Sequence, residues 1–405
     1  MSATTNRLKS LPKLSALWAI IKVLSMPRPL VMLGEGSAQR LCRSMADQGL
    51  TRVLVITDDV LAKLGTVDPL IAELKSHGVA TTLFTGVRPD PTFEVVEAGL
   101  AACKAARADA ILVVGGGSAI DAGKVIALAA STGKTPQQLI GVLKGRKPSL
   151  PFFVVTSTSG TGSEASVAAV ISDSTTHIKS LLVDPAMVPK AAALDPLITQ
   201  GMPASVTAET GIDALTHALE GWVSGFSNAE TDSYNSTAVR MIFKHLEIAC
   251  NEPKNLAARE AMALASHYAG ICLNITAVGY VHAIAHQLGA NYGVPHGRAN
   301  AMVLPHVLTF NKPNCLKKYA LLARDLGFAS AQQSDSVAAD ALIAKVHELL
   351  ARLPLKNQGD LVKRSDYERI AHDALTEAHG MYSVPRYMVE ADVYRVLDGV
   401  VAAAR

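Results

Sequence analysis

Residues Ala110–Lys124 read AILVVGGGSAIDAGK and carry a strong structural signal. The continuous apolar run Ala110–Val114 is typical of a strand covered on both faces of a parallel sheet, and Ser118–Ala130 reads as a helix. Glycines at such a strand-to-helix turn let backbone N–H groups approach an anion at the positive end of the helix. The stretch therefore predicts a strand–turn–helix unit with a phosphate site at the turn.

The same alternation extends from about residue 28 to residue 195. Further runs of β-branched or aromatic residues predict strands, and alanine-rich stretches between them predict helices. The expected strands are Arg52–Thr57, Thr81–Thr85, Pro151–Thr156 and Ala191–Leu194, and the expected helices include Val60–His77 and Phe93–Arg107. Strands that alternate with helices indicate an α/β domain with a mainly parallel sheet.

The pattern changes after Asp195-Pro196, where helical windows dominate and few strand-like runs remain. The windows are Ser205–Ser224, Glu230–Cys250, Leu256–Asn274, His282–Leu288, Ala299–Thr309, Leu316–Leu326, Ser336–Leu353 and Tyr367–Ala378. We therefore predict an α/β nucleotide-binding domain at residues 1–195, with residues 1–27 as a helical extension. An all-helical metal-binding domain is expected at residues 196–405.

Composition excludes several classes of protein. The chain has 405 residues, of which 49% are hydrophobic and 18% charged, so it can bury two cores. A net charge of +3 without a basic run among aromatics gives no sign of nucleic-acid binding. The segment Leu14–Ser25 is too short to span a bilayer, so we expect no membrane partner and read it as an amphipathic helix packed on the body or on a partner subunit. Five scattered cysteines without a CxxC pair indicate free thiols and a cytoplasmic protein.

Two features of the first half could bind a nucleotide. The glycine turn, Gly115–Gly117, matches neither GxGxxG nor the Walker A loop, so on its own it favours a phosphate site over a plain tight turn. Asp58 ends a predicted strand and could accept hydrogen bonds from an adenosine ribose, although Asp58 or Asp59 could equally cap the next helix. A second loop rich in small hydroxyls, Thr156–Ser166, also follows a strand; we call it the hydroxyl loop.

Histidines and a carboxylate in the second half indicate a metal site. Asp213 and His217 are four residues apart and share one helix face, and His282 and His286 repeat this spacing. His296 lies in a Pro-His-Gly loop that can return toward the same point. Imidazole nitrogen with carboxylate oxygen is a donor set for Fe(II) or Zn(II). Spacing leaves open which of His282 and His286 ligates, and the HExxH motif of zinc proteases is absent.

Taken together, these motifs closely resemble the iron-containing (group III) alcohol dehydrogenase family. The matching elements span about residues 50–311 and occur at family-like spacing: Asp58, PDPT (89–92), GGGSAIDAGK (115–124), TSTSGTGSE (156–164), Lys179, Asp184-Pro185, GIDALTHALEGW (211–222), GYVHAIAHQLGANYGVPHGRAN (279–300) and Leu304-Pro305-His306. Two positions depart from the family pattern. Asp90 stands where asparagine is common, and Gly123 where a bulkier residue is usual.

The resemblance implies a fold and a set of site residues. The fold is a parallel α/β domain followed by an all-helical domain, the dehydroquinate-synthase-like architecture. One divalent metal, usually Fe(II) and otherwise Zn(II) or another metal, would be held by Asp213, His217, His282 and His296. The cofactor would be NAD, with NADP disfavoured by Asp58, and its contacts would be Asp58, Gly115, Gly116, Gly117, Ser118, Thr158, Thr161 and Lys179. His286, as a proton relay, and Asp121, near the nicotinamide, are the catalytic candidates.

The resemblance implies the reversible oxidation of a primary alcohol to an aldehyde or ketone by a homodimer or larger assembly. The residues expected to shape the pocket, Ser224–Asn235, Tyr268–Tyr280 and those near Phe310, are mostly small or moderately apolar and favour a short- to medium-chain alcohol. The metal would lower the pKa of the alcohol and NAD would accept the hydride. Hydroxyacid–oxoacid transhydrogenases, maleylacetate reductases and zinc-dependent glycerol-type dehydrogenases are alternatives within the oxidoreductases. A dehydroquinate-synthase-type lyase needs several basic residues, and the metal motifs offer mainly Arg298. A non-catalytic metal protein would leave the glycine turn and Asp58 unexplained.

Overall fold

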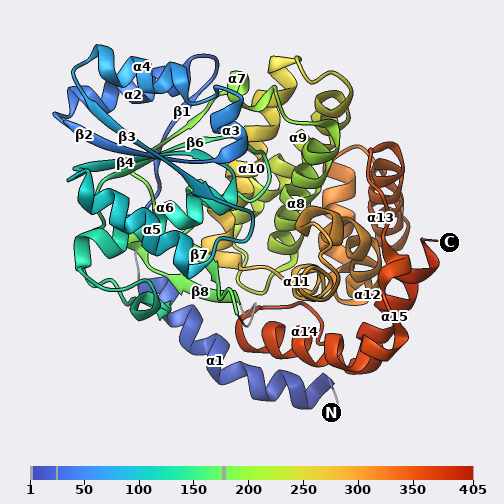
Figure 1. Ribbon diagram of the computed structural model, residues 1–405. Coiled ribbons are helices and arrows are strands. Elements are labelled where there is room, and N and C mark those ends of the chain that lie inside the picture. The colour runs from blue at the N-terminus through green and yellow to red at the C-terminus, as the bar shows by residue number, and fades with distance from the viewer. Residues whose placement is uncertain (1–2, 24–25, 176–178, 405) are drawn as a thin grey trace. The chain divides into compact units, whose positions relative to one another are not determined.

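The computed structural model describes residues 3–23, 26–175 and 179–404 (Figure 1). The chain forms two compact units. We call one the sheet unit; it comprises Met26–Met202 and Pro253–Asn274. The other, the helical unit, comprises Met1–Ser25, Pro203–Glu252 and Ile275–Arg405. The predicted class, a parallel α/β domain followed by a helical one, is confirmed.

A six-stranded parallel sheet forms the centre of the sheet unit, in the order β1-β9-β6-β4-β2-β3. Its strands are β1 (Leu30–Leu33), β2 (Arg52–Asp58), β3 (Ala80–Val87), β4 (Ala110–Gly115), β6 (Phe152–Thr156) and β9 (Ala191–Leu194). The register pairs Leu112 of β4 with Val55 and Phe153. Strand β4 is therefore central, which explains its continuous apolar run.

Helices cover both faces of this sheet (Figure 1). Alternate residues of β4 face two separate cores, because successive side chains of a strand point to opposite faces. Ile111 and Val113 pack with α5 (Phe93–Ala105) and α6 (Gly117–Thr132). Ala110, Leu112 and Val114 pack with α2 (Ser37–Asp47) and α4 (Asp68–Ser76).

Some parts of the sheet unit differ from the prediction. The single helix expected at Val60–His77 is wrong: the chain forms α3 (Asp59–Lys63) and α4, and between them Gly65 adopts a φ of 71° that ends the first helix. A small second sheet was not predicted, and its strands are β5 (Gly141–Val142), β7 (Ala168–Ser172) and β8 (Lys179–Val183). The remaining short helices of this unit are η1 (Gln137–Leu139), η2 (Ser163–Ala165), η3 (Pro185–Met187) and α7 (Pro196–Thr199).

Helix α10 (Leu256–Thr276) follows the boundary predicted from sequence, yet most of it belongs to the sheet unit. A side chain on Gly270 would come within 2.5 Å of the carbonyl oxygen of Gly162, so the two backbones touch. His267 and Glu164 also form a buried contact of 3.0 Å between Nδ1 and Oε1. The hydroxyl loop is thus packed directly on α10.

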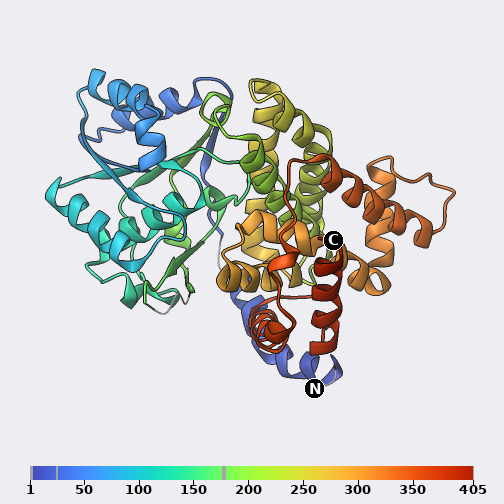
Figure 2. The same cartoon turned by 45° about the vertical axis from the view of Figure 1, so that its right-hand side comes forward.

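The helical unit contains the remaining long helices. They are α1 (Ala3–Val23), α8 (Ala204–Val223), α9 (Ala229–Asn251), α11 (Tyr280–Tyr292), α12 (His296–Asp325), α13 (Asp335–Arg352), α14 (Tyr367–Met381) and α15 (Glu390–Ala402), with the short η4 (Gly359–Leu361) and η5 (Arg364–Asp366). Helix α12 was predicted as two helices, but it continues through Pro305 and Pro313. Helix α1 lies along α14 (Figure 2).

Within the described residues no single helix meets the length and apolarity that a bilayer crossing requires. Helices α10 and α11 satisfy these two criteria only when they are taken together, and that pair is bent by 103°.

Gly123 allows α6 to lie close to β4. A Cβ atom at this position would stand 2.4 Å from Cγ2 of Val113. Ala has the higher helix propensity, by about 1 kcal/mol. We nevertheless expect Gly123→Ala to lower the free energy of unfolding by about 1–3 kcal/mol in urea denaturation, because the crowding outweighs propensity.

Two further variants check this cause. Gly201→Ala should change stability by less than about 0.5 kcal/mol, since nothing lies within 4 Å of its Cβ position. The double variant Val113→Ala with Gly123→Ala should lose less stability than the sum of the two single losses, by a coupling of at least about 0.5 kcal/mol. Strict additivity of the two changes would contradict the steric explanation.

Candidate metal centre and cofactor loops

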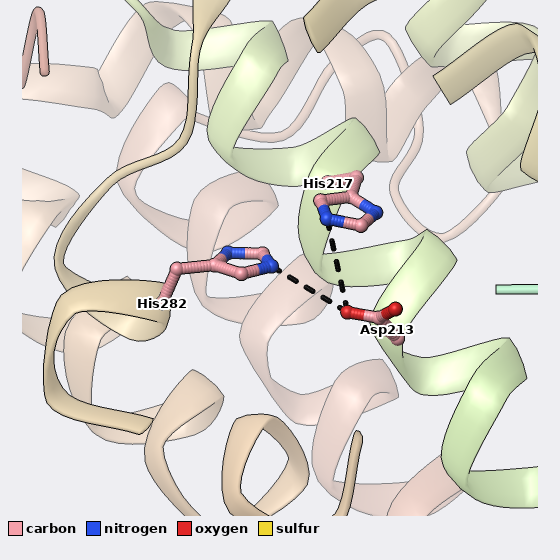
Figure 3. A group of neighbouring side chains, drawn as sticks. All are labelled: Asp213, His217 and His282. Atoms are coloured by element: carbon pink, nitrogen blue, oxygen red, sulfur yellow. Dashed lines mark ion pairs between the residues drawn. The ribbon is translucent and has the colours of Figure 1, made fainter. Parts of the chain in front are cut away.

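Four potential metal ligands surround one carboxylate oxygen in the helical unit. Oδ1 of Asp213 lies 3.8 Å from Nε2 of His217, 3.5 Å from Nε2 of His282 and 3.2 Å from Nε2 of His296. Figure 3 shows the first two imidazoles directed at the carboxylate. The ligand atoms of Asp213, His217 and His282 all lie within 4.8 Å of one another. The structure therefore brings together all four residues that the resemblance implies.

Three helices supply these side chains. Asp213 and His217 lie one turn apart on α8, His282 lies in the first turn of α11, and His296 begins α12. The rings of His217 and His282 stack at 4.5 Å. The side chain of His296 is 38% exposed, whereas that of Asp213 is 3% exposed. Three members of the group are thus buried, and His296 is partly exposed.

The electrostatics of this group favour a cation. Burial would raise the pKa of Asp213, but the facing imidazoles of His217, His296 and His282 hold that pKa well below its usual range. Burial would likewise lower the pKa of His282, yet the carboxylates of Asp213 and Glu220 raise it to about 9. No lysine or arginine pairs with Asp213 in the part of the chain that the structure describes. Three imidazole nitrogens and one carboxylate oxygen fit Fe(II) or Zn(II).

His286 lies beside this group and has a different partner. Its Nδ1 is 2.7 Å from Oε1 of Glu377, which also accepts a hydrogen bond of 2.5 Å from the hydroxyl of Tyr382. Its ring stacks on His296 at 5.2 Å between centroids. Burial lowers the pKa of His286, and Glu377 only partly offsets that effect. The structure thus directs His282, and not His286, at Asp213.

Sequence reasoning missed three residues around the metal centre. Glu220 contacts Nδ1 of His282, Glu377 contacts His286, and Asn300 donates a 2.8 Å hydrogen bond to Oδ1 of Asp213. Glu220 and Asn300 carried a usable signal, because Glu220 lies seven residues after Asp213 and Asn300 four residues after His296, spacings that share a helix face. Glu377 is 91 residues from its partner, and its sequence neighbours give no hint of the contact.

The glycine turn and the hydroxyl loop are packed together in the sheet unit. A Cβ atom on Gly116 would lie 2.9 Å from Thr158, and one on Gly117 would lie 2.7 Å from Thr161. Gly116 is the N-cap of α6, so the N–H groups that follow it, including that of Ser118, belong to the open end of the helix. The residues predicted for the pyrophosphate thus border Thr158 and Thr161.

Asp121 is bonded within the sheet unit. Oδ1 accepts a 2.6 Å hydrogen bond from Ser163, and Oδ2 accepts one of 2.9 Å from the backbone N–H of Val170. The fully buried Lys124 donates to Ser163 and Ser166 as well. Burial raises the pKa of Asp121. Asp121 and Lys124 therefore join α6 to the hydroxyl loop, while the catalytic role of Asp121 stays a prediction.

The last two cofactor candidates have partners in the protein. Oδ1 of Asp58 accepts hydrogen bonds of 2.8 and 2.9 Å from the N–H groups of Val60 and Leu61, so Asp58 caps α3. Within the described residues its Oδ2 accepts none, and the capping role leaves that oxygen available for a ribose. Lys179 forms a 2.7 Å ion pair with Asp90.

Comparisons with known proteins agree with this geometry. Residues 29–196 match the family model described as iron-containing alcohol dehydrogenase, and residues 207–401 match that of the C-terminal part of the Fe-containing alcohol dehydrogenase family. Alcohol dehydrogenase 4 of Schizosaccharomyces pombe is 36% identical over 86% of this chain and 82% of its own length. The NAD-dependent methanol dehydrogenase of Bacillus methanolicus is 31% identical over 91% of this chain and 97% of its own. The crystal structure of a 1,3-propanediol oxidoreductase superposes with a TM-score of 0.89 at 34% identity, over 93% of this chain and all of that one.

Substitution of single histidines should separate the ligands from their neighbour. We expect His282→Ala and His296→Ala to lose stoichiometric metal after gel filtration, because each removes a donor atom facing Asp213. His286→Ala should keep about one equivalent, since its ring nitrogen faces Glu377. Metal analysis of the purified variants is the measurement. Full retention by both His282→Ala and His296→Ala would contradict the ligand assignment.

Proposed function

This chain belongs to the iron-containing alcohol dehydrogenase family and is an NAD-linked, metal-dependent alcohol dehydrogenase, and we propose that it oxidises short- to medium-chain primary alcohols reversibly to aldehydes. The observation that carries the proposal is the convergence of Asp213, His217, His282 and His296 on one point. Fe(II) bound there would serve as a Lewis acid for the hydroxyl of the substrate.

The protein's own residues would handle the proton. Because Nδ1 of His286 is engaged by Glu377, its Nε2 is the nitrogen left to take a proton from the alcohol. The hydroxyl of Tyr382 holds the same oxygen of Glu377 and so helps to fix the imidazole. This arrangement supports His286 as the first acceptor in a proton relay.

The sheet unit would hold the cofactor. Backbone N–H groups at the start of α6, around Gly116, Gly117 and Ser118, supply an anion site for the pyrophosphate. NAD supplies the redox chemistry, as acceptor of the hydride. Thr158 and Thr161 border the glycine turn and would contact the cofactor next to it. Oδ2 of Asp58 would accept hydrogen bonds from the adenosine ribose, which favours NAD over NADP.

We further propose that the protein works in the cytoplasm and forms a homodimer or larger assembly. We also propose that the cofactor-binding domain ends at Asp195 and the metal-binding domain begins at Pro196. All five cysteines are buried free thiols, as expected in a reducing compartment. Leu8 and Leu11 on α1 are 63% and 43% exposed, and apolar side chains of this kind support a subunit contact.

The geometry disfavours the lyase alternative. Arg298 was the basic residue expected near the metal motifs, but its Nε donates to Glu209 at 2.9 Å and its Nη1 donates to Gln358 at the same distance. An arginine engaged in this way is poorly placed to recognise an acidic, phosphorylated substrate.

Turnover with defined alcohols tests the proposed activity. We expect the protein, reconstituted anaerobically with Fe(II), to reduce NAD with ethanol, 1-propanol, 1-butanol and 1,3-propanediol. It should use these alcohols with a higher kcat/KM than glycerol or a hydroxyacid. NADH formation followed by absorbance is the measurement, with metal-depleted protein as the control. Absence of NADH with every alcohol, despite bound NAD and metal, would favour the transhydrogenase.

Asp58 provides a test of cofactor choice. Asn caps helices as well as Asp does, so Asp58→Asn should keep α3 capped while removing the negative charge. We expect the ratio of kcat/KM for NADP to that for NAD to rise by about 10-fold or more, which corresponds to about 1.4 kcal/mol. Asp59→Asn is the matched control and should leave the ratio unchanged. An unchanged ratio in Asp58→Asn would mean that Asp58 acts only as a cap.

A further inference from the structure

Glu220 lies on the same face of α8 as Asp213 and His217, and it is buried. Three donors point at its two oxygens. Oε2 accepts from the backbone N–H of Gly279 at 2.8 Å and from Nδ1 of His282 at 2.6 Å. Oε1 accepts from the backbone N–H of Val281 at 2.7 Å. All three donors therefore belong to the N-cap and the first turn of α11.

Two of these bonds cap α11 from another helix. The N-cap residue of α11 is Gly279, which has no side chain to satisfy the first N–H groups of the helix. Glu220 takes that place, and a Cβ atom on Gly279 would stand 2.7 Å from its Oε1. The start of α11, and with it the backbone position of His282, is thereby tied to α8.

The third bond sets the tautomer of His282. A carboxylate can only accept, so the proton of a neutral His282 must lie on Nδ1. Nε2 is then left with its lone pair on the side of Asp213, 3.5 Å from Oδ1. Asp213 and Glu220 together also carry two negative charges, one on each side of this imidazole, which equal the charge of Fe(II) in magnitude.

We propose that Glu220 is a positioning residue of the metal centre: by bonding Nδ1 of His282 and the first N–H groups of α11, it makes His282 a competent ligand. This inference rests on the proposed metal site. Substitution of a carboxylate that bonds the second ring nitrogen of a ligating histidine typically lowers metal affinity by about 10- to 100-fold.

The variant Glu220→Gln distinguishes positioning from simple packing. Its amide has nearly the same shape, but one oxygen becomes an NH2 group that only donates. The one remaining oxygen can accept at most two of the three bonds, and where the NH2 group faces Nδ1, His282 must move its proton to Nε2 and accept at Nδ1. In that tautomer Nε2 cannot ligate. We therefore expect the Kd for Zn(II) or Co(II), measured by competition with a chelator, to rise about 10- to 100-fold.

Glu164→Gln is the matched control. Glu164 is also buried against a histidine, His267, at 3.0 Å, but it lies in the sheet unit and its histidine is not in the metal group. We expect its Kd for metal to stay within about twofold of the wild-type value. An equal Kd in Glu220→Gln and wild type would overturn the inference. Failure of the wild-type protein to bind either metal would overturn the proposed metal site and this inference with it.

A measurement on the unaltered protein covers the case in which Glu220→Gln does not fold. Nitrogen chemical shifts of 15N-labelled histidine in the Zn(II)-loaded protein report which ring nitrogen carries the proton. The imidazole of His282, assigned by its loss in His282→Gln, should be protonated at Nδ1 and metal-bound at Nε2. The opposite assignment would overturn the role of Glu220.

Discussion

The buried carboxylate of Asp213, faced by three imidazoles, is the constraint on which the helical unit depends. A charge taken out of water is costly unless it is paired, and in the described residues no lysine or arginine pairs with this one. Its partners must come from α8, α11 and α12, so these three helices have to meet at one point. The same requirement explains why a divalent cation suits the site: it supplies positive charge beside Asp213 that no lysine or arginine of the described residues supplies.

The sequence predicts much of this site but does not show which of His282 and His286 is the metal ligand. Asp213 and His217 share a helix face by spacing alone, and so do His282 and His286. What separates the last two is the partner of each Nδ1. Those partners, Glu220 and Glu377, lie 62 and 91 residues away in the chain, and only the packing of helices brings them into contact. The sequence therefore predicts the candidate ligands, and the tertiary structure shows which of the two histidines faces Asp213.

The fold shows the same division between local and long-range causes. The run Ala110–Val114 predicts a central strand because burial on both faces requires apolar residues at every position. The gap between the predicted helices Ala299–Thr309 and Leu316–Leu326 contains Pro313, but α12 continues through it, with Leu308 and Cys315 buried on either side of that proline. Most of α10 belongs to the sheet unit, where Gly270 packs against the backbone of Gly162. The periodicity of the sequence does not predict this contact.

Both sites are built from a recognisable motif that a second element holds in place. The N–H groups of the glycine turn can be reached because Gly116 and Gly117 lack side chains, and Thr158 and Thr161 occupy the space that side chains would need. Asp121 and its neighbour Lys124 then fix the hydroxyl loop that carries those threonines. Glu220 holds His282 of the histidine motif, as Asp121 and Lys124 hold the hydroxyl loop beside the glycine motif. A substitution of Asp121, Lys124 or Glu220 should therefore disturb binding while leaving the glycines and the side chains that face the metal unchanged.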